Sequence, residues 1–564
     1  MRRSLIVWTL AVPLAALALP PAFAAGPEQP PVRSIHDIGA LVAPDASGRR
    51  PSAAAWSPDG SRLTYLWDEK GEGSGKALWV LEVATGKSAV VSSPGELGDK
   101  DKKKDEKLEV DGYSWSPKGD ALLIEAGGEL YLKSLAGTLR RLTHTEGAEE
   151  APRFSPDGRR IAFVRSFDLY VMDVATGAET RLTTDGEENV ALNGINDWVY
   201  GEEIWNRNPE GFWWSPDGSR LAFYHFDETP VGVYPLVDDS PLYPKVTLQK
   251  YPKSGEPNPK VKVGVVSVTG GKTLWLATGD DDSYPARVEW TPKGDAVAVQ
   301  RLARDQKHLD LLRCGAGDGA CTTLLSETWP TWLNLGDDFR FLPDGRFLWG
   351  SERDGWRRLY LYGADGRPVE AVTPEGWVVT SLDALADDGS WAVVTAYPTS
   401  ELGPIDRKVA RVSLNGHGWQ VLTPEPGFHS AVVSSKTGAW VHSWSTADLP
   451  SRSEVRPAGG GRSLVLPSAA PKFDAATLPK WEFLTIPGPD GSRLAARILK
   501  PAGFDPAHRY PVIVYHYGGP GSQVVSNAWS PRDVWHKLMA EQGFVVFSVD
   551  NQSSLFFGKK GEDR

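Results

Sequence analysis

Two adjacent carboxylates, Glu202 and Glu203, end the run Asp197-Trp-Val-Tyr-Gly-Glu-Glu203. Two neighbouring carboxylates can share one ammonium group, and each then accepts a charge-assisted hydrogen bond. Their mutual repulsion is unfavourable while the site is empty, and a bound ammonium relieves it. An isolated glutamate pair on a short helix is in most proteins an ordinary solvated surface. The pair is therefore a candidate site for a cationic amino terminus, and the surrounding sequence has to support it.

A second candidate group is Tyr517, which follows an apolar run and precedes the turn Gly518-Gly-Pro-Gly521. A phenol with a pKa near ~10 stays protonated at neutral pH, so its hydroxyl can donate a hydrogen bond to a developing oxyanion. The alternative is an aromatic side chain that caps the end of a strand. Tyr517 is thus a candidate hydrogen-bond donor, whose role depends on the family resemblance given below.

The strained Gly-x-Ser-x-Gly turn that exposes a nucleophilic serine in α/β-hydrolases does not occur in the 564 residues. Ser522 lies in a glycine-rich turn, but Pro520 and Val524 occupy the positions where glycine is required. In that fold the histidine follows the serine and the aspartate, whereas every histidine here lies at or before residue 536. We therefore expect this chain, as it stands, to lack the Ser-Asp-His triad and any catalysis that depends on it.

The elements that would position these groups are indicated by a repeated turn motif, W-S-P-D-G, with eight variants whose glycines lie about 54 residues apart on average. Ser, Pro, Asp and Gly in this order suit the four positions of a type I turn. The copies begin at Trp56, Trp115, Phe154, Trp214, Trp290 and Phe341, and two degraded copies end at Gly389 and Gly438.

Apolar strands follow the turns, as in Arg160–Val164 and Arg220–Tyr224, and a third short strand such as Glu179–Leu182 comes after a further turn. A repeat of this length predicts a four-stranded antiparallel blade, and eight repeats predict a mainly β protein with an eight-bladed β-propeller over residues 26–455. Seven or nine blades remain open because the last copies are degraded. A β-sandwich with coincidental turns is the alternative fold.

Two segments interrupt the repeat. The charged run Gly98–Lys107 is expected to be a solvated loop. The gap between Gly158 and Gly218 is about 20 residues longer than the one before it and contains the glutamate pair. Insertions of this kind lie at blade edges and often carry function.

Residues 456–480 are rich in Pro, Gly and Ala and are expected to be a linker. Beyond it, strand-like runs at Trp481–Ile486 and Leu494–Lys500 precede a helical pattern at Val534–Gly543 and a buried strand at Phe544–Asp550. Strands that alternate with a helix are typical of the start of an α/β-hydrolase sheet. We therefore expect a partial α/β-hydrolase domain over residues 481–564.

The first 25 residues indicate a secretory signal peptide, with Arg2 and Arg3 before an apolar stretch and the small-x-small pattern Ala22-Phe23-Ala24. The apolar stretch is short for a membrane span, so no stable membrane insertion is expected, although a retained anchor is the alternative. The mature protein is expected to be periplasmic or secreted. The net charge of −11 argues against nucleic acid as a partner.

Cys314 and Cys321 flank a Gly-rich stretch between two apolar runs, which indicates the tip of a hairpin. In an oxidising compartment a disulfide between them is expected, with two free thiols as the alternative. No metal site is expected, because two cysteines without nearby histidines cannot complete one.

The motifs together resemble the dipeptidyl peptidase IV subfamily of the prolyl oligopeptidase serine peptidases. The resemblance is carried by the D-W-V-Y-G-E-E run that leads into Trp213-Trp-Ser-Pro-Asp-Gly218, by Ser351-Glu-Arg-Asp-Gly-Trp356 and by the paired cysteines, and it extends from about residue 50 to the C-terminus. It implies that Glu202 and Glu203 bind the substrate's amino terminus and that Tyr517 stabilises the oxyanion.

The resemblance also implies a function: removal of N-terminal dipeptides with penultimate Pro or Ala from peptides with a free amino terminus, without a cofactor, by a protein that can form a homodimer. The family usually adds an arginine from an earlier blade, which cannot be placed here, and Arg165 is a weak candidate for it. One alternative is a non-catalytic propeller that binds peptide amino termini. The other is a scaffold propeller without a ligand, which the glutamate motif disfavours.

Overall fold

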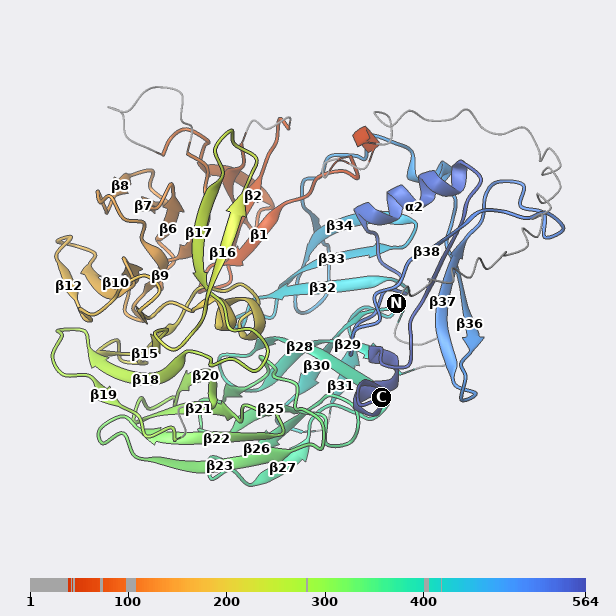
Figure 1. Ribbon diagram of the computed structural model, residues 1–564. Helices are drawn as coiled ribbons and strands as arrows, with labels where there is room; N and C mark the ends of the chain where they lie inside the picture. Colours follow the sequence, from red (N-terminus) through yellow and green to blue (C-terminus); the bar gives the residue numbers. More distant parts are fainter. Residues whose placement is uncertain are drawn as a thin grey trace, which may run out of the picture.

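The computed structural model describes residues 39–41, 43, 46–71, 75–97, 108–279, 282–399, 405–416 and 418–564. The expected signal peptide at 1–25 and the charged run Gly98–Lys107 lie outside the described residues. Eight antiparallel sheets follow one another along the chain, and Figure 1 shows them arranged in a ring. The mainly β, propeller-type fold expected from the repeats is confirmed.

In seven blades the strands pair in chain order, and blade four has a fifth strand and two interruptions. Blades one to four consist of β1 (Ser52–Trp56), β2 (Arg62–Trp67), β3 (Ala77–Glu82), β4 (Lys87–Ser92), β5 (Gly112–Trp115), β6 (Ala121–Ala126), β7 (Glu129–Ser134), β8 (Leu139–Arg141), β9 (Glu150–Phe154), β10 (Arg160–Arg165), β11 (Asp168–Asp173), β12 (Glu179–Arg181), β13 (Ala191–Asn193), β14 (Phe212–Trp214), β15 (Arg220–Asp227), β18 (Lys260–Ser267) and β19 (Leu274–Trp275).

Blades five to eight consist of β20 (Tyr284–Trp290), β21 (Ala296–Leu302), β22 (His308–Gly315), β23 (Cys321–Thr328), β24 (Arg340–Phe341), β25 (Phe347–Ser351), β26 (Arg358–Tyr362), β27 (Pro368–Ala371), β28 (Trp377–Leu385), β29 (Trp391–Pro398), β30 (Lys408–Ser413), β31 (Trp419–Val421), β32 (Phe428–Val433), β33 (Trp440–Thr446), β34 (Leu449–Arg456) and β35 (Leu464–Val465).

The ring closes between the first and the eighth blade. Leu63 and Tyr65 of blade one share a buried apolar cluster with Val441 and Val455 of blade eight. Other clusters join blades one and two, two and three, three to five, five and six, six and seven, and seven and eight. Each sheet therefore buries both of its faces against neighbours, which is how stacked repeats build a continuous core.

The W-S-P-D-G motif forms the turn between the first and second strands of a blade. In the first copy Ser57 Oγ donates to Asp59 Oδ1 at 2.6 Å, the Gly60 amide donates to the Ser57 carbonyl at 2.8 Å, and Gly60 has φ +69°. The hydrogen bond from the Ser57 hydroxyl, with those from Ser61, lowers the pKa of Asp59 to about 2. This left-handed φ explains why glycine occupies the position, because residues with a Cβ atom rarely adopt a positive φ.

The same turns also join neighbouring blades. A Cβ built on Gly119 would lie 3.5 Å from Cδ of Pro58 in the preceding turn, so that glycine is in contact with its neighbour's proline. The motif's tryptophans donate their indole N–H to the preceding blade: Trp56 to Val432 O, Trp115 to Thr64 Oγ1, Trp214 to Arg153 O and Trp290 to Trp213 O. The chain has 23 tryptophans, an unusually high number, and this use of the motif explains part of the excess.

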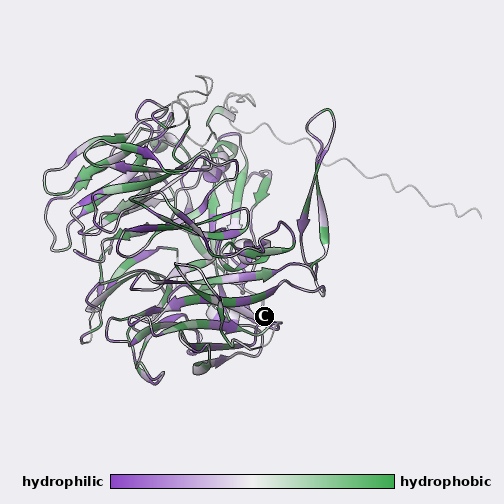
Figure 2. Ribbon diagram, turned by 90° about the vertical axis from the view of Figure 1, so that its left-hand side faces the viewer, coloured by the Kyte–Doolittle hydropathy of each residue, from purple (hydrophilic) through white to green (hydrophobic). Residues whose placement is uncertain are grey.

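Blade four carries two insertions. A single π-helical turn, η1 (Tyr200–Ile204), lies between β13 and β14. An antiparallel hairpin of β16 (Val233–Asp238) and β17 (Lys245–Lys250) forms its own two-stranded sheet between β15 and β18. Figure 2 shows this hairpin standing away from the propeller at the right of the view.

The C-terminal segment forms a four-stranded sheet of order β36-β37-β39-β38, with β36 (Glu482–Pro487), β37 (Arg493–Leu499), β38 (Val512–Val514) and β39 (Val545–Val549). β38 and β39 are parallel and are connected through helix α2 (Pro531–Glu541), which begins earlier than predicted because Ser530 caps it and Pro531 takes the first position. Short helices η2 (Ala475–Thr477), η3 (Leu555–Phe557) and α3 (Gly558–Glu562) complete the description.

The expected linker at 456–480 needs a correction. Residues Leu464 and Val465 form β35, which pairs with β34 as the outer strand of blade eight, so the propeller extends past residue 455. The Pro, Gly and Ala content predicted a linker throughout, because an outer strand of only two residues leaves almost no apolar pattern in the sequence. The strands expected from Trp481 and Leu494 onward are present as β36 and β37.

The C-terminal segment packs onto blade eight through polar contacts. Lys537 of α2 is buried and donates to Asp448 and to the Pro479 carbonyl, the latter at 2.7 Å. Asn527 donates to Asp406 at 2.9 Å and accepts from the Ala447 amide at 2.9 Å. Among the described residues no helix is long and apolar enough to cross a membrane.

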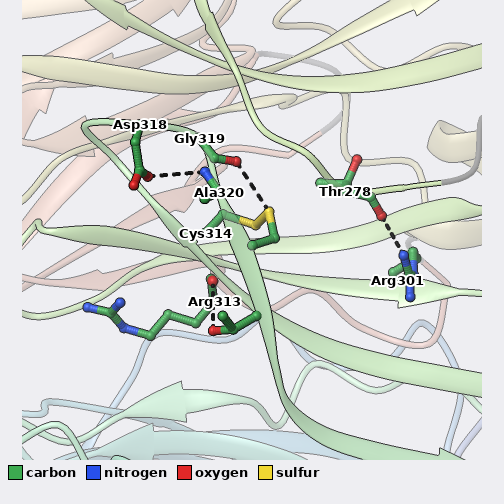
Figure 3. The surroundings of a disulfide bond; sticks show 9 residues. Thr278, Arg301, Arg313, Cys314, Asp318, Gly319 and Ala320 are labelled. Carbon is green, nitrogen blue, oxygen red and sulfur yellow. Dashed lines mark hydrogen bonds between the residues drawn. A yellow bond between two sulfur atoms is a disulfide. The ribbon is translucent and has the colours of Figure 1, made fainter.

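Cys314 and Cys321 are joined by a disulfide at the end of the β22–β23 hairpin, where they face each other across the two strands. Figure 3 shows the bond beside Asp318 and Ala320, which form the hairpin turn. The hairpin and the pairing expected from the sequence are confirmed.

Candidate functional site

The helix η1 that carries Glu202 and Glu203 is fixed at its start. Asp197 accepts hydrogen bonds from the amides of Val199 at 3.2 Å and Tyr200 at 2.9 Å. The Tyr200 side chain is 1% exposed and packs edge-on against two buried aromatic rings of β15, Tyr224 at 5.4 Å and Phe226 at 4.9 Å. Residues that follow Tyr200 are thereby held at the surface of blade four.

The two candidate carboxylates differ in their surroundings. Glu203 is exposed. The Glu202 side chain is 36% exposed and forms an ion pair with Arg207, whose Nη2 lies 2.8 Å from Glu202 Oε1. Hydrogen bonds from Arg207 lower the pKa of Glu202, so this carboxylate is ionised at neutral pH. Arg207 is itself 79% exposed, and an incoming ammonium group can compete with it for the carboxylate.

The C-terminal end of η1 meets blade five. Arg287 of β20 donates from Nη2 to the Ile204 carbonyl at 2.8 Å, and its guanidinium carbon lies 4.4 Å from the centroid of the Trp205 ring. Trp205 and Arg287 also line a cavity of about 380 Å³, whose lining includes neither Glu202 nor Glu203. The sequence motif predicts that the two carboxylates face the space between the propeller and the C-terminal segment, and the lining of this cavity does not test that prediction.

Arg165, the weak candidate for an additional arginine, is engaged within its own blade. Its Nε lies 2.7 Å from Glu149 Oε1 and its Nη1 2.8 Å from Glu179 Oε2, and the side chain is 13% exposed. Two buried or half-buried carboxylates thus already neutralise this guanidinium.

Tyr517 follows β38 and is 70% exposed. The glycine turn behind it is attached to the loop after β39: the Gly518 carbonyl accepts from Asn551 Nδ2 at 3.0 Å, and the Gly521 amide donates to the Ser553 carbonyl at 2.8 Å. Gly518 has φ +84° and Gly521 has φ +66°, conformations that favour glycine. The phenol is accessible to a ligand, and its role in oxyanion binding remains a prediction.

Within the part of the chain that the structure describes, no histidine of the C-terminal segment is hydrogen-bonded to a serine. His536 is 2% exposed on α2, and its Nδ1 lies 3.3 Å from Asp533 Oδ1, which also accepts from the buried Arg497. Among the described residues no group of three or more His, Cys, Asp or Glu side chains is arranged to hold a metal ion.

Sequence reasoning missed three residues that hold η1, namely Asp197, Trp205 and Arg287. Asp197 stands where an N-cap residue is expected, so its side-chain type was a usable signal. Arg287 lies more than eighty positions from the helix along the chain, and nothing in its local sequence indicates the contact.

These observations define the class: a closed β-propeller with a carboxylate-bearing helix on blade four, followed by a mixed α/β segment. The model of the dipeptidyl peptidase IV N-terminal region matches residues 116–451, and the chain belongs to this family.

Named relatives agree with this assignment. The dipeptidyl peptidase 4 of Arthroderma otae is 28% identical over 464 residues, which cover 75% of this chain and 57% of the relative. A probable dipeptidyl peptidase 4 of Aspergillus flavus is 26% identical and covers 74% of this chain and 56% of the relative. The chain thus spans a little over half the length of these curated relatives.

Two solved structures are similar to this chain. The crystal structure of Porphyromonas gingivalis dipeptidyl peptidase 4 matches with a TM-score of 0.80 and 26% identity, over 93% of this chain and 74% of that chain. A putative dipeptidyl aminopeptidase IV from Bacteroides ovatus matches with a TM-score of 0.73 and 24% identity, over 92% of this chain and 74% of that chain, and shows the shared fold.

Proposed function

We propose that this chain is the substrate-anchoring part of a serine-type exopeptidase that removes N-terminal dipeptides, and that Glu202 and Glu203 bind the substrate's amino terminus. The observation that carries the proposal is the placement of two adjacent carboxylates on one helical turn held over a buried aromatic floor. The match to the dipeptidyl peptidase IV N-terminal region supports it.

The proposed amino-terminus site would fix the distance from the substrate's ammonium group to the carbonyl that is attacked. One residue spans at most ~3.6 Å, so an ammonium held at a fixed point places the second residue's carbonyl at a fixed distance from it. Charge-assisted hydrogen bonds to these two carboxylates are weakened by solvent screening, because Glu203 is exposed and Glu202 is open to water. The ammonium also replaces Arg207 beside Glu202, which reduces the net gain. We therefore expect weak to moderate affinity for short peptides.

Tyr517 would supply one donor to the oxyanion that forms when a nucleophile attacks the peptide carbonyl. The 564 residues contain no Gly-x-Ser-x-Gly turn, so we propose that this chain by itself does not complete the reaction. Preference for penultimate Pro or Ala is proposed from the family alone.

A non-catalytic protein that binds peptide amino termini is the second candidate. It is favoured by one contrast: the proposed anchor lies within the described residues, whereas no Gly-x-Ser-x-Gly turn occurs in the 564 residues. In either case a periplasmic or secreted location is proposed, which suits the disulfide.

Calorimetry tests the anchor. A peptide that begins Ala-Pro is titrated into the full chain with a free amino terminus and, in parallel, with an acetylated one. We expect binding of the free form only, weakened about 10–100-fold in Glu202→Gln/Glu203→Gln. The control variant Glu187→Gln/Glu188→Gln removes another adjacent, exposed carboxylate pair and should bind as wild type. Equal binding of both peptides would reject the anchor.

A chromogenic Ala-Pro amide separates the two candidate functions. The chain alone should give no cleavage above background, while a longer chain that carries the family's C-terminal segment should cleave if the exopeptidase proposal holds. Cleavage by the 564-residue chain, blocked by a serine-directed phosphonate, would show that the sequence contains a nucleophile that we have not identified. A longer chain that binds but never cleaves would favour the binding protein.

We also propose a second copy of this chain as a partner, through the β16–β17 hairpin. Every residue of β16 is exposed, and contiguous exposed apolar surface commonly marks an interface. The exposed apolar side chains of the hairpin are Val233, Tyr234, Leu236, Val237, Leu242, Tyr243, Val246 and Leu248.

Sedimentation velocity tests the homodimer. Val237 and Val246 face each other across the hairpin and are 60% and 58% exposed. Val237→Asp/Val246→Asp should convert the dimer to a monomer, whereas Val465→Asp, at an 81% exposed position on β35, should not. A monomeric wild type at tens of micromolar would remove the proposal.

A further inference from the structure

Arg287 of β20 connects the carboxylate helix with a segment from another blade. Three of its nitrogens are engaged: Nη2 donates to the Ile204 carbonyl at 2.8 Å, Nη1 to the Ala286 carbonyl at 2.8 Å and Nε to Asp337 at 2.7 Å. Its plane also lies over Trp205. The side chain is 11% exposed, so it contacts the helix end and has little surface for a ligand.

The contact with Ile204 is at the end of η1, where carbonyl groups have no partner within the helix and carry partial negative charge. A guanidinium is suited to this position because its planar fork can donate in several directions while it stacks on an aromatic ring. The start of the helix is held by Asp197, and Arg287 holds its other end.

Asp337, the carboxylate partner of Arg287, belongs to the segment 329–338 between β23 and β24. The same segment is bound by the C-terminal residues of the chain. Asn334 donates to Glu562 at 2.7 Å, Trp329 donates to Asp563 at 2.8 Å, and Lys559 Nζ lies 3.8 Å from the Trp332 ring centroid.

The contacts therefore form one continuous connection: η1, Arg287, Asp337, segment 329–338 and α3. Its two ends are the parts that the proposed function requires at a fixed separation, the ammonium anchor and the C-terminal segment with Tyr517. A shift of about 1 Å in a bound group can cost about 100-fold in a reaction that depends on alignment.

We propose that Arg287 is a positioning residue, which fixes the Glu202–Glu203 helix against segment 329–338 and thereby against the C-terminal segment. The inference rests on the proposed amino-terminus site. It assigns Arg287 no direct contact with substrate.

Hydrogen exchange on the full chain tests, independently of any peptide, whether Arg287 holds the end of η1. In Arg287→Ala the amides of residues 198–207 should exchange at least ~10-fold faster than in wild type. Arg287→Lys should lie between the two, because an ammonium keeps the charge but loses the fork and the stacking. The control is Arg456→Ala in blade eight, which also removes a guanidinium that stacks on an indole, Trp440, and pairs with a carboxylate, Glu454.

Peptide titration then tests the consequence. Binding of the free-amine Ala-Pro peptide should weaken about 10-fold in Arg287→Ala, less in Arg287→Lys, and not in Arg456→Ala. Unchanged exchange at 198–207, equal effects of Arg456→Ala, or faster exchange with unchanged affinity would each overturn the proposal. If wild type itself binds no peptide, the anchor function fails, and the exchange data alone decide whether Arg287 holds the helix.

Discussion

The propeller and the C-terminal sheet differ in how their sheets are enclosed by the rest of the structure. In the propeller every sheet packs between two others, and the hydrogen bond from Trp56 to Val432 closes the ring. In the C-terminal sheet β38 pairs with β39 on one side, and within the described residues no strand pairs with its other side. Val512 and Val514 of β38 are 58% and 59% exposed.

This difference bears on the two candidate groups. Glu202 and Glu203 stand on a helix whose two ends are tied to buried parts of a closed ring. Tyr517 follows the open-edged strand β38, and its turn is hydrogen-bonded to the loop after β39. A closed ring can preorganise a binding group by itself, whereas a group at an open edge is only as well placed as that edge. The anchor should therefore tolerate changes in the C-terminal sheet.

The largest expected effect comes from Asp533→Ala. Arg497 and Asp533 form a buried bidentate ion pair at 3.0 and 3.1 Å, which joins β37 to α2. Removal of one partner leaves an uncompensated buried charge and should cost about 3–5 kcal/mol. Limited proteolysis should then cut the C-terminal segment while the propeller stays resistant. Asp490→Ala, which removes an exposed pair with Arg564, is the control and should have little effect. Simultaneous loss of the propeller would refute the independence of the two regions.

The next largest effect is expected from loss of the disulfide, which lies in blade five of the propeller. Its loop is short, so the loop-entropy model gives about 2–3 kcal/mol of stabilisation. Cys314→Ser/Cys321→Ser should lower the thermal midpoint of the propeller. Reductant should lower the thermal midpoint of the wild-type propeller by the same amount. No change with reductant in wild type would mean that the bond does not form in solution.

A pH test addresses the base of the anchor helix. Burial raises the pKa of Glu228 to about 7 and that of Asp197 to about 6, and the charge of Asp197 adds to the rise in the pKa of Glu228. The folded state therefore favours the protonated forms, so stability near η1 is highest below about pH 4 for these groups and falls as pH rises toward 7. Lys250 opposes this effect and Glu188 adds to it.

Glu228→Gln should flatten the decline in stability between about pH 4 and 7, measured as hydrogen exchange of residues 198–207 corrected for the intrinsic rate. The exposed Glu256→Gln should leave the slope as in wild type. A wild-type slope of the opposite sign would contradict the assignment of burial as the dominant cause.

Much of the fold could be predicted because each copy of the repeat fixes its turn with residues that are neighbours in the sequence. The turn W-S-P-D-G specifies its own geometry through Ser57, Asp59 and Gly60, and the spacing of its copies indicated eight blades. The cysteine hairpin was predictable for the same reason. The outer strand β35 was not, since two residues carry no periodicity.

The site was predictable only where a motif surrounds it. Glu202 and Glu203 could be singled out from the run that contains them, but their support by Tyr224, Phe226 and Arg287 depends on contacts between distant parts of the chain. The sequence also showed the tryptophan excess without its purpose, because the acceptor of each indole N–H is in a different blade.

The smallest expected effect comes from a test of the indole hydrogen bond between blades one and eight, where the ring closes. Trp56→Phe removes the indole N–H that donates to Val432 O at 2.8 Å and leaves an aromatic ring in place. The lost hydrogen bond should cost about 1 kcal/mol. Trp79→Phe in the same blade is the matched control, because its buried indole nitrogen has no hydrogen-bond partner among the described residues. Both changes remove similar ring area, so the difference between their urea midpoints isolates the hydrogen bond. Trp56→Phe should also speed amide exchange in β1 and β32, at the junction of blades one and eight, more than in β20. Equal midpoints for the two variants, with uniform exchange, would mean that apolar packing alone closes the ring.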